Sequence, residues 1–189
     1  MNPMRKSSLL FLLTCFAFLS SHGQTPDFMF ALEGTYVGQK EIPDATAGGG
    51  RRTLDARLDG RRNGAEDGFV LQWKLAKDVS NAQQTSDSVA VLMVTEQLET
   101  WHWDDNRGRM VITRIVDNKP IIEDWFVMDE TSSRAVLERG GEWANAPALH
   151  RLTLERLAGQ IRFERRVNAG DGKWTVVHRY MLNDFVQED

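Results

Sequence analysis

Apolar and polar side chains alternate along most of this chain, and this alternation constrains its fold more than any other feature. It is clearest over residues 53–59, where Leu54, Ala56 and Leu58 alternate with charged residues. A period of two places successive side chains on opposite faces of an extended strand, so the pattern is typical of half-buried antiparallel strands. No window has the period of an amphipathic helix, and no repeat has the length of a solenoid unit. The chain is therefore predicted to be all-β.

Ten strand-like segments follow one another and are separated by turn-forming residues. They cover residues 32–39, 53–59, 69–75, 89–103, 109–116, 121–128, 134–139, 151–155, 161–167 and 173–183. Turn residues stand at 104–108, 117–120, 158–159 and 169–172, and the segment containing Gly140, Gly141 and Pro147 is predicted to be a loop. Consecutive hairpins favour an antiparallel up-and-down meander closed into a β-barrel of about 8–10 strands, because closure hides the strand edges. A β-sandwich is the alternative.

A short entry segment precedes the first strand. Asp27 is suited to cap one helical turn through Phe28, Met29 and Phe30. The apolar side chains of this turn are predicted to plug one end of the barrel.

Residues 1–23 have the organisation of a secretory signal peptide. Arg5 and Lys6 provide a basic start, an apolar run covers residues 9–19, and small residues surround His22. The run is shorter than the roughly 20 residues of a membrane span, so no integral membrane segment is expected after the leader is removed. A lipoprotein cleavage site at Cys15 is the alternative, although Thr14 does not favour it. The sequence thus predicts a secreted or periplasmic protein with a single domain over residues 24–189.

The predicted mature chain has 189 − 23 = 166 residues and an acidic balance. Cys15 is the one cysteine, so removal of the leader excludes a disulfide, a thiolate nucleophile and a cysteine metal ligand. The leader carries two of the 23 basic residues and no acidic residue, which leaves 21 − 27 = −6 for the mature protein. This charge argues against general binding to nucleic acids.

The first and last strands carry the features of a known superfamily. Gly34-Thr35-Tyr36 at the start of the first strand resembles the glycine-x-tryptophan motif of the calycins, which include the lipocalins and fatty-acid-binding proteins, with tyrosine in place of tryptophan. The chain resembles the secreted bacterial lipocalin-like domains of unknown function more than it resembles the animal lipocalins. The resemblance implies that Arg179, on a late strand, packs across Tyr36 and closes the barrel end. It also implies a cup-shaped cavity for a small hydrophobic or amphipathic ligand.

Large apolar and aromatic side chains on the inward faces are the candidates for lining such a cavity. Two pairs, Trp101 with Trp103 and Glu123 with Trp125, each share one face of a strand, and an inward carboxylate needs a ligand or an arginine as its partner. The predicted ligand-binding residues are Phe69, Leu71, Trp73, Trp101, Trp103, Glu123, Trp125, Phe163 and His178. Burial of apolar ligand surface is predicted to supply most of the affinity.

Three histidines raise the question of metal binding or catalysis. His102, His150 and His178 lie on three different strands, so their positions carry no metal-ligand spacing, and no metal, cofactor or catalytic residue is predicted. Two alternatives remain open. An enzyme using His102, Glu123 or His178 requires a polar cluster that water reaches inside the barrel, whereas a structural or interaction protein requires a barrel filled by its own side chains.

Overall fold

The computed structural model describes residues 26–43, 50–63, 68–78, 92–116 and 118–185. The predicted signal peptide, residues 1–23, lies outside these ranges. No helix within them has both the length and the apolar character required to span a bilayer.

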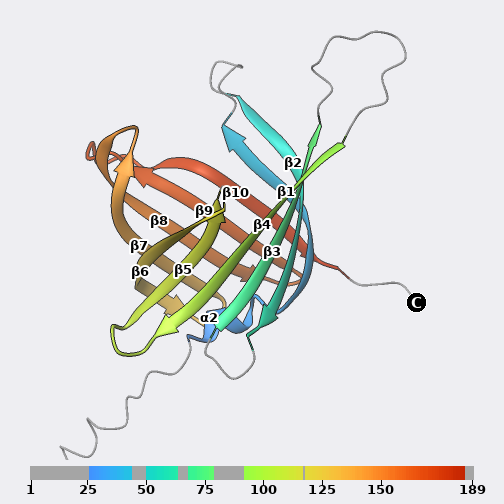
Figure 1. The fold of residues 1–189 in the computed structure, drawn as a ribbon, viewed down its shortest axis with the longest axis horizontal. Helices are drawn as coiled ribbons and strands as arrows, with labels where there is room; N and C mark the ends of the chain where they lie inside the picture. The colour runs from blue at the N-terminus through green and yellow to red at the C-terminus, as the bar shows by residue number, and fades with distance from the viewer. Residues whose placement is uncertain (1–25, 44–49, 64–67, 79–91, 117, 186–189) are drawn as a thin grey trace, which may run out of the picture.

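The described chain forms ten antiparallel strands and one short helix, α2 (Asp27–Phe30) (Figure 1). Each strand pairs with its neighbours in sequence, and the first strand also pairs with the last, so the sheet is a closed barrel. The predicted all-β meander barrel is confirmed, and the β-sandwich alternative is wrong. The strands are β1 (Gly34–Pro43), β2 (Arg51–Arg62), β3 (Gly68–Asp78), β4 (Leu92–Asp104), β5 (Arg109–Val116), β6 (Lys119–Thr131), β7 (Arg134–Trp143), β8 (Ala146–Leu157), β9 (Gln160–Asn168) and β10 (Thr175–Asp184).

The seam between β1 and β10 closes the barrel. Its register runs from the pair of Tyr36 with Asp184 to the pair of Glu41 with Arg179. Gly38 lies in this seam, and a Cβ atom built on it would come within 2.1 Å of the carbonyl oxygen of Met181. The two backbones approach so closely here that no side chain fits between them, which explains the glycine.

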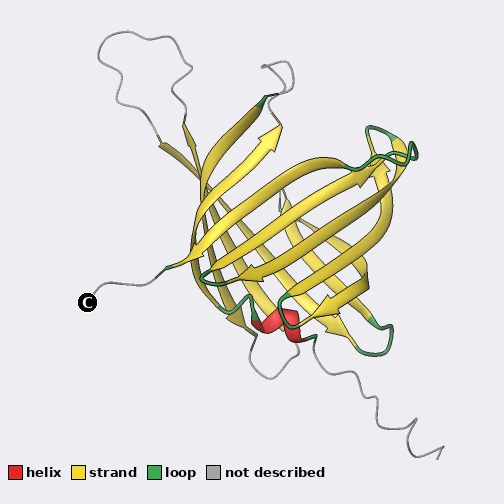
Figure 2. Cartoon of the chain, turned by 180° about the vertical axis from the view of Figure 1, so that it is seen from behind, coloured by secondary structure: helices red, strands yellow, loops and turns green. Residues whose placement is uncertain are grey.

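One end of the barrel is closed by α2, which lies beneath it (Figure 2). Phe28 and Met29 are 1% and 0% exposed, so they form the plug predicted for this turn, whereas Phe30 is 41% exposed. Asp27 makes no capping hydrogen bond with its side chain, and Pro26 occupies the N-cap position. Burial of this apolar plug excludes water from the closed end and stabilises it.

Tyr36 ties the first strand to this closed end. Its ring is buried, and its hydroxyl donates hydrogen bonds to the carbonyl oxygens of Ala31 (2.9 Å) and Glu33 (3.0 Å). Arg156, the penultimate residue of β8, donates to the same Ala31 oxygen (3.1 Å) and to the Tyr36 hydroxyl (3.3 Å). An arginine from a late strand therefore does meet this tyrosine.

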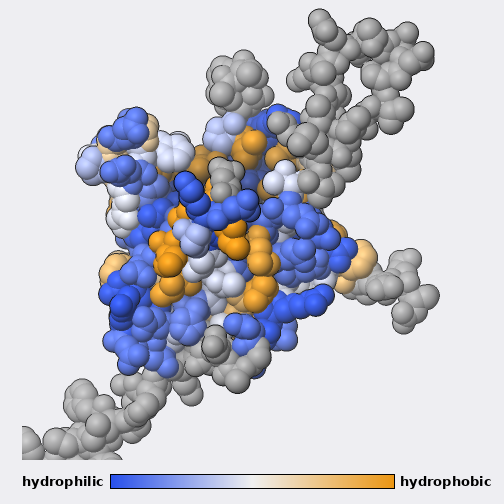
Figure 3. All heavy atoms as spheres, viewed as in Figure 1, coloured by the Kyte–Doolittle hydropathy of each residue, from blue (hydrophilic) through white to orange (hydrophobic). Residues whose placement is uncertain are grey.

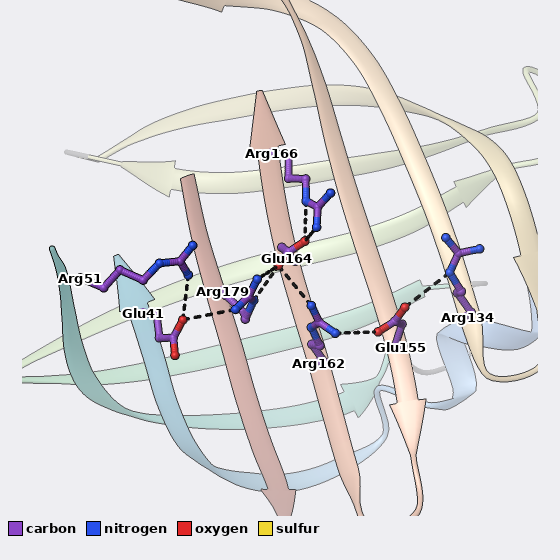
Figure 4. A network of polar contacts seen from close by, with 8 residues as sticks. All are labelled: Glu41, Arg51, Arg134, Glu155, Arg162, Glu164, Arg166 and Arg179. Atoms are coloured by element: carbon purple, nitrogen blue, oxygen red, sulfur yellow. Dashed lines mark hydrogen bonds and ion pairs between the residues drawn. The ribbon is translucent and has the colours of Figure 1, made fainter. Parts of the chain in front are cut away.

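The prediction that Arg179 would pack across Tyr36 is wrong. Arg179 lies between the inward residues His178 and Tyr180 of β10, so strand alternation turns it to the outer face. There its Nε donates to Glu164 Oε2 at 2.6 Å, and its guanidinium also faces Glu41 (Figure 4).

Glu164 is the centre of an ionic network on this outer face (Figure 4). It accepts hydrogen bonds from Arg179, Arg162 (3.3 Å) and Arg166 (2.5 Å), which leave it 3% exposed. Burial tends to raise the pKa of Glu164, but the hydrogen bond from Arg179 and the charge of Arg166 outweigh it, so the pKa lies below its ordinary value. The network links β1, β9 and β10 across the seam.

The segment around Gly140, Gly141 and Pro147 is paired strand, and the predicted loop there is wrong. Gly140 pairs with Leu149, and the hairpin turns only at Ala144 and Asn145, where φ is 50° and 63°. Two consecutive residues with positive φ make the tight turn that matches strand twist. The glycines weakened the strand pattern in the sequence without ending the strand.

An irregularity in β10 changes which of its side chains face inward. The register shifts between Val176 and His178, where Val177 is the extra residue. As a result Trp174, which regular alternation from His178 would place on the inward face, instead lies against Arg151 of β8, whose Cζ atom is 4.1 Å from the Trp174 ring centroid. Val177 and His178 both border the interior.

Candidate functional site

A cavity of about 460 Å³ occupies the part of the barrel beyond the closed end. On β1, Tyr36 belongs to the filled core, and Lys40, four residues further along, borders the cavity. The interior is therefore filled only towards α2. Side chains from nine strands surround the open part: Lys40 (β1), Trp73 (β3), Gln97, Glu99 and Trp101 (β4), Ile112 and Arg114 (β5), Glu123 and Trp125 (β6), Arg139, Glu142 and Trp143 (β7), His150 and Leu152 (β8), Phe163 and Arg165 (β9), and Val177, His178 and Tyr180 (β10).

Packed aromatic rings form one wall of the cavity. The ring centroids of Trp73 and Tyr180 are 4.4 Å apart, and those of Trp73 and Phe163 are 5.2 Å apart with an edge-to-face geometry. Trp101 lies edge-on to Phe163 at 6.3 Å. Rings that brace one another in this way hold a preformed apolar surface against which a ligand can pack.

A cluster of three arginines around one carboxylate forms another wall. Glu123 is 7% exposed, and its Oε1 lies 2.5 Å from Arg114 Nη2, 2.6 Å from Arg139 Nη2 and 3.7 Å from Arg165 Nη2. The arginines come from β5, β7 and β9, so barrel closure brings them together. The carboxylate compensates for one of the three positive charges.

The described interior consequently has an excess of positive charge. Besides the arginine cluster, the cavity is lined by Lys40 and Glu99, which gives four cations against two carboxylates, or 4 − 2 = +2. A third carboxylate, Glu142, is exposed at the rim. An excess of cations inside a protein is costly unless anions balance it, so this charge distribution suits an anionic guest.

Burial shifts the pKa values of Glu99, Lys40 and His178 in the direction that favours the neutral form of each group. It raises the pKa of Glu99, while hydrogen bonding by Trp101 and the charge of Arg114 oppose the shift. It lowers the pKa of Lys40, with Glu99 opposing. Burial, together with the charges of Lys40, Arg165 and Arg114, lowers the pKa of His178 to about 3, so this imidazole is neutral at pH 7.

Several buried hydrogen-bond donors in the cavity wall have no acceptor among the described residues. They are Arg114 Nε, Arg139 Nε and Trp125 Nε1. The guanidinium Cζ atoms of Arg139 and Arg165 lie 5.2 Å and 5.7 Å from the centroid of the Trp125 ring. Buried N–H groups are nearly always paired in proteins, and these three can only donate, so an acceptor-rich guest would satisfy them.

The residues predicted to bind ligand divide between the cavity and the core. Trp73, Trp101, Glu123, Trp125, Phe163 and His178 line the cavity. Phe69 and Leu71 are fully buried in the core, because they lie nearer than Trp73 to the α2 end of β3. Trp103 packs against the core but does not line the cavity.

The three histidines do not converge. His150 and His178 border the cavity, whereas His102 is exposed and out of phase with the cavity residue Trp101. No group of three or more His, Cys, Asp or Glu side chains in the described ranges is arranged to hold a metal ion.

Apart from Glu123, sequence reasoning missed the charged residues of the site, namely Lys40, Glu99, Arg114, Arg139 and Arg165, and it also missed Tyr180. A signal for them was present. Arg114 is in phase with the buried Ile112, and Arg139 is in phase with the buried Leu137. A charged residue in phase with an apolar face indicates an inward charge, provided that the strand continues regularly.

Comparison of the sequence with protein-family models gave no match, and comparison with curated protein sequences gave no significant match.

Proposed function

We propose that this protein binds a small amphipathic organic anion in the barrel cavity. The observation that carries the proposal is the cluster of Arg114, Arg139 and Arg165 around the single carboxylate of Glu123, beside unpaired donors that point to a missing acceptor. A carboxylate, phosphate or sulfate group would balance the excess charge and accept these hydrogen bonds. The wall of Trp73, Phe163 and Tyr180 would bury the apolar part of the same molecule.

We also propose that the barrel is of the calycin type and that the protein acts outside the cytoplasm. A closed antiparallel meander, a buried aromatic on the first strand and an arginine from a late strand against that aromatic support the first part. In this assignment Arg156 has the role that the resemblance to the calycins implied for Arg179. The leader-like residues 1–23 support the second part.

An acid–base enzyme is the second candidate, because polar groups with shifted pKa values gather in one cavity. Glu99, Lys40 and His178 are such groups. None of the described cavity-lining residues is Ser, Thr or Cys, so the cavity wall offers no hydroxyl or thiol nucleophile of that kind. Binding of an anion explains the unpaired donors of Arg114, Arg139 and Trp125 directly. Catalysis by a Ser, Thr or Cys nucleophile needs a side chain that the described cavity wall does not provide.

The proposal is tested with dodecanoate and dodecanol, two probes of equal chain length that differ in charge. Isothermal titration calorimetry of the protein is expected to give micromolar binding of dodecanoate and at least tenfold weaker binding of dodecanol. Arg139→Gln should weaken dodecanoate at least tenfold and leave dodecanol unchanged, since it removes one cation from the cavity. Arg107→Gln, on the exposed turn before β5, is the matched control. Equal affinities for the two probes, or binding of neither, would overturn the proposal.

Native mass spectrometry of protein purified gently from its own source complements this test. A retained anionic molecule would identify the ligand class directly.

A further inference from the structure

The barrel wall separates between β4 and β5. Within the described residues, β4 pairs with β3 from Leu92 to His102 but with β5 only from Glu99 to Asp104. Beyond the pair of Glu99 with Arg114, β5 continues alongside β6 alone. The two strands therefore share their hairpin end and part towards the other end of the barrel (Figure 1). We call this separation the β4–β5 gap.

The gap begins at the cavity. Glu99 and Arg114, the last paired residues, both line the cavity, and so does Gln97, the next inward residue on β4. A molecule whose anionic group lies by Arg114 would thus have the gap directly beside it.

The borders of the gap are apolar and accessible. Leu98 on β4, Ile115 and Val116 on β5, and Ile121 on β6 are 44%, 53%, 42% and 40% exposed. Strand alternation places Val116 and Ile121 on the cavity side with Arg114 and Glu123, and Leu98 and Ile115 on the outer side. Apolar side chains over β4–β6 are also visible on the surface (Figure 3). Exposed apolar side chains therefore border the gap on both faces of the barrel wall, next to the cavity residues Gln97, Glu99 and Arg114.

We propose that the β4–β5 gap is the binding site for the far end of the ligand's alkyl chain. The anionic group would lie among Arg114, Arg139 and Arg165, and the first part of the chain would pack on the aromatic wall of the cavity. The far end would leave the barrel sideways, against Val116, Ile121 and Leu98. This inference rests on the proposed function, because the arginine cluster is what orients the molecule. It defines the ligand more narrowly, as a single-chain amphiphile whose chain is long enough to reach from the arginine cluster to the gap.

The test is a chain-length series of linear carboxylates from octanoate to tetradecanoate, measured by calorimetry below their micelle concentrations. In the wild-type protein each added methylene is expected to tighten binding, by at most about fourfold. Ile121→Gln, which places an amide on the cavity side of the gap, should weaken dodecanoate at least tenfold and change octanoate less than twofold. Ile122→Gln is the matched control, because the neighbouring residue is 66% exposed and faces outward from the same strand.

Each result is decisive. Binding of octanoate and dodecanoate with equal affinity, or an unchanged dodecanoate affinity in Ile121→Gln, would overturn the gap as a chain site while leaving the anion site intact. Failure of every carboxylate to bind would overturn the proposed function, and this inference with it. A dimer in light scattering that Leu98→Gln dissociates would assign the apolar borders to a second copy of the chain and would also overturn the inference.

Discussion

At the level of single residues, Glu123 is the counterion that the three arginines of the cavity share. Its carboxylate holds three guanidinium groups from three strands, and it is almost fully buried. The same residue stabilises the barrel and limits how strongly the interior attracts an anion. Replacement of Glu123 by a neutral residue should therefore lower the stability of the barrel while increasing its attraction for an anion.

Glu123→Gln is expected to lower the free energy of unfolding by about 3–5 kcal/mol, because it leaves the arginine charges buried without their counterion. Urea denaturation followed by tryptophan fluorescence measures the loss. Glu142→Gln, at the exposed rim, is the control and should change stability by less than about 0.5 kcal/mol. Addition of dodecanoate should increase the stability of Glu123→Gln by more than that of the wild-type protein, since the carboxylate of dodecanoate replaces the negative charge that the variant lacks. A variant as stable as the wild type would contradict this account.

His178 makes the stability of the barrel depend on pH. Its pKa is about 3 in the folded protein, against an ordinary value of 6.5, so folding favours the neutral imidazole. The unfolded chain therefore takes up more protons between these values, and the stability contributed above pH 6.5 is lost as the pH falls towards 3. This histidine should account for a loss of about 2–4 kcal/mol over that window.

The measurement compares urea denaturation curves of the wild-type protein and His178→Gln between pH 7 and pH 4. The wild type should lose more stability than the variant, while carboxylates such as Glu164 affect both proteins alike. His102→Gln, which changes an exposed histidine, should retain the wild-type profile. Parallel profiles for the wild type and His178→Gln would show that this imidazole does not change its protonation on folding.

At the level of elements, the seam between β1 and β10 depends on close approach of two backbones. Gly38→Ala should lower the free energy of unfolding by about 1–3 kcal/mol, because the Cβ of the alanine would overlap the carbonyl oxygen of Met181. Gly140→Ala is the matched control, since a Cβ there would meet no atom within 4 Å and that position also lies in a strand. Thermal denaturation of both variants measures the difference. If the two substitutions had equal effects, the seam would not be as tight as described.

The elements also show how much of the fold the sequence could predict. Alternation indicated ten strands in the correct order, and the bounds of β5 agree with the predicted segment 109–116. The pattern failed where a strand was irregular. The bulge at Val177 reversed the side on which Trp174 lies, and a one-residue shift of this kind leaves no mark in the sequence.

The site was predicted less completely than the fold, for a physical reason. Aromatic residues such as Trp73 and Phe163 indicate burial by themselves, so the apolar wall could be anticipated. Arg114, Arg139 and Arg165 are separated in sequence and become neighbours only when β5, β7 and β9 curve around one interior. Alternation gives each strand two faces, but charged residues alone do not tell which face is the inner one.

At the level of the whole molecule, the first and last strands are neighbours. The chain should therefore tolerate a circular permutation in which its present ends are joined and it is opened at a turn between two other strands. A circular permutant that joins residue 185 to residue 26 through a short flexible linker and opens the Ala158–Gly159 turn should keep the fold, because that turn contributes no core residue. Far-ultraviolet circular dichroism and dodecanoate affinity should match those of the wild type. A permutant opened at Phe163, inside β9, should fail to fold. Success of both permutants would contradict the closed sheet.

The seam also sets a condition on how the barrel is made. The first residues of β1 and β10 are separated by 175 − 34 = 141 positions. During synthesis β1 therefore cannot pair with β10 until this whole length of chain has been made. Until the last strand emerges, the growing sheet has two free edges, and each can accept a strand from a neighbouring unfinished chain. Crowded nascent chains would therefore tend to exchange terminal strands, and dilution during refolding should favour monomers over interlocked dimers.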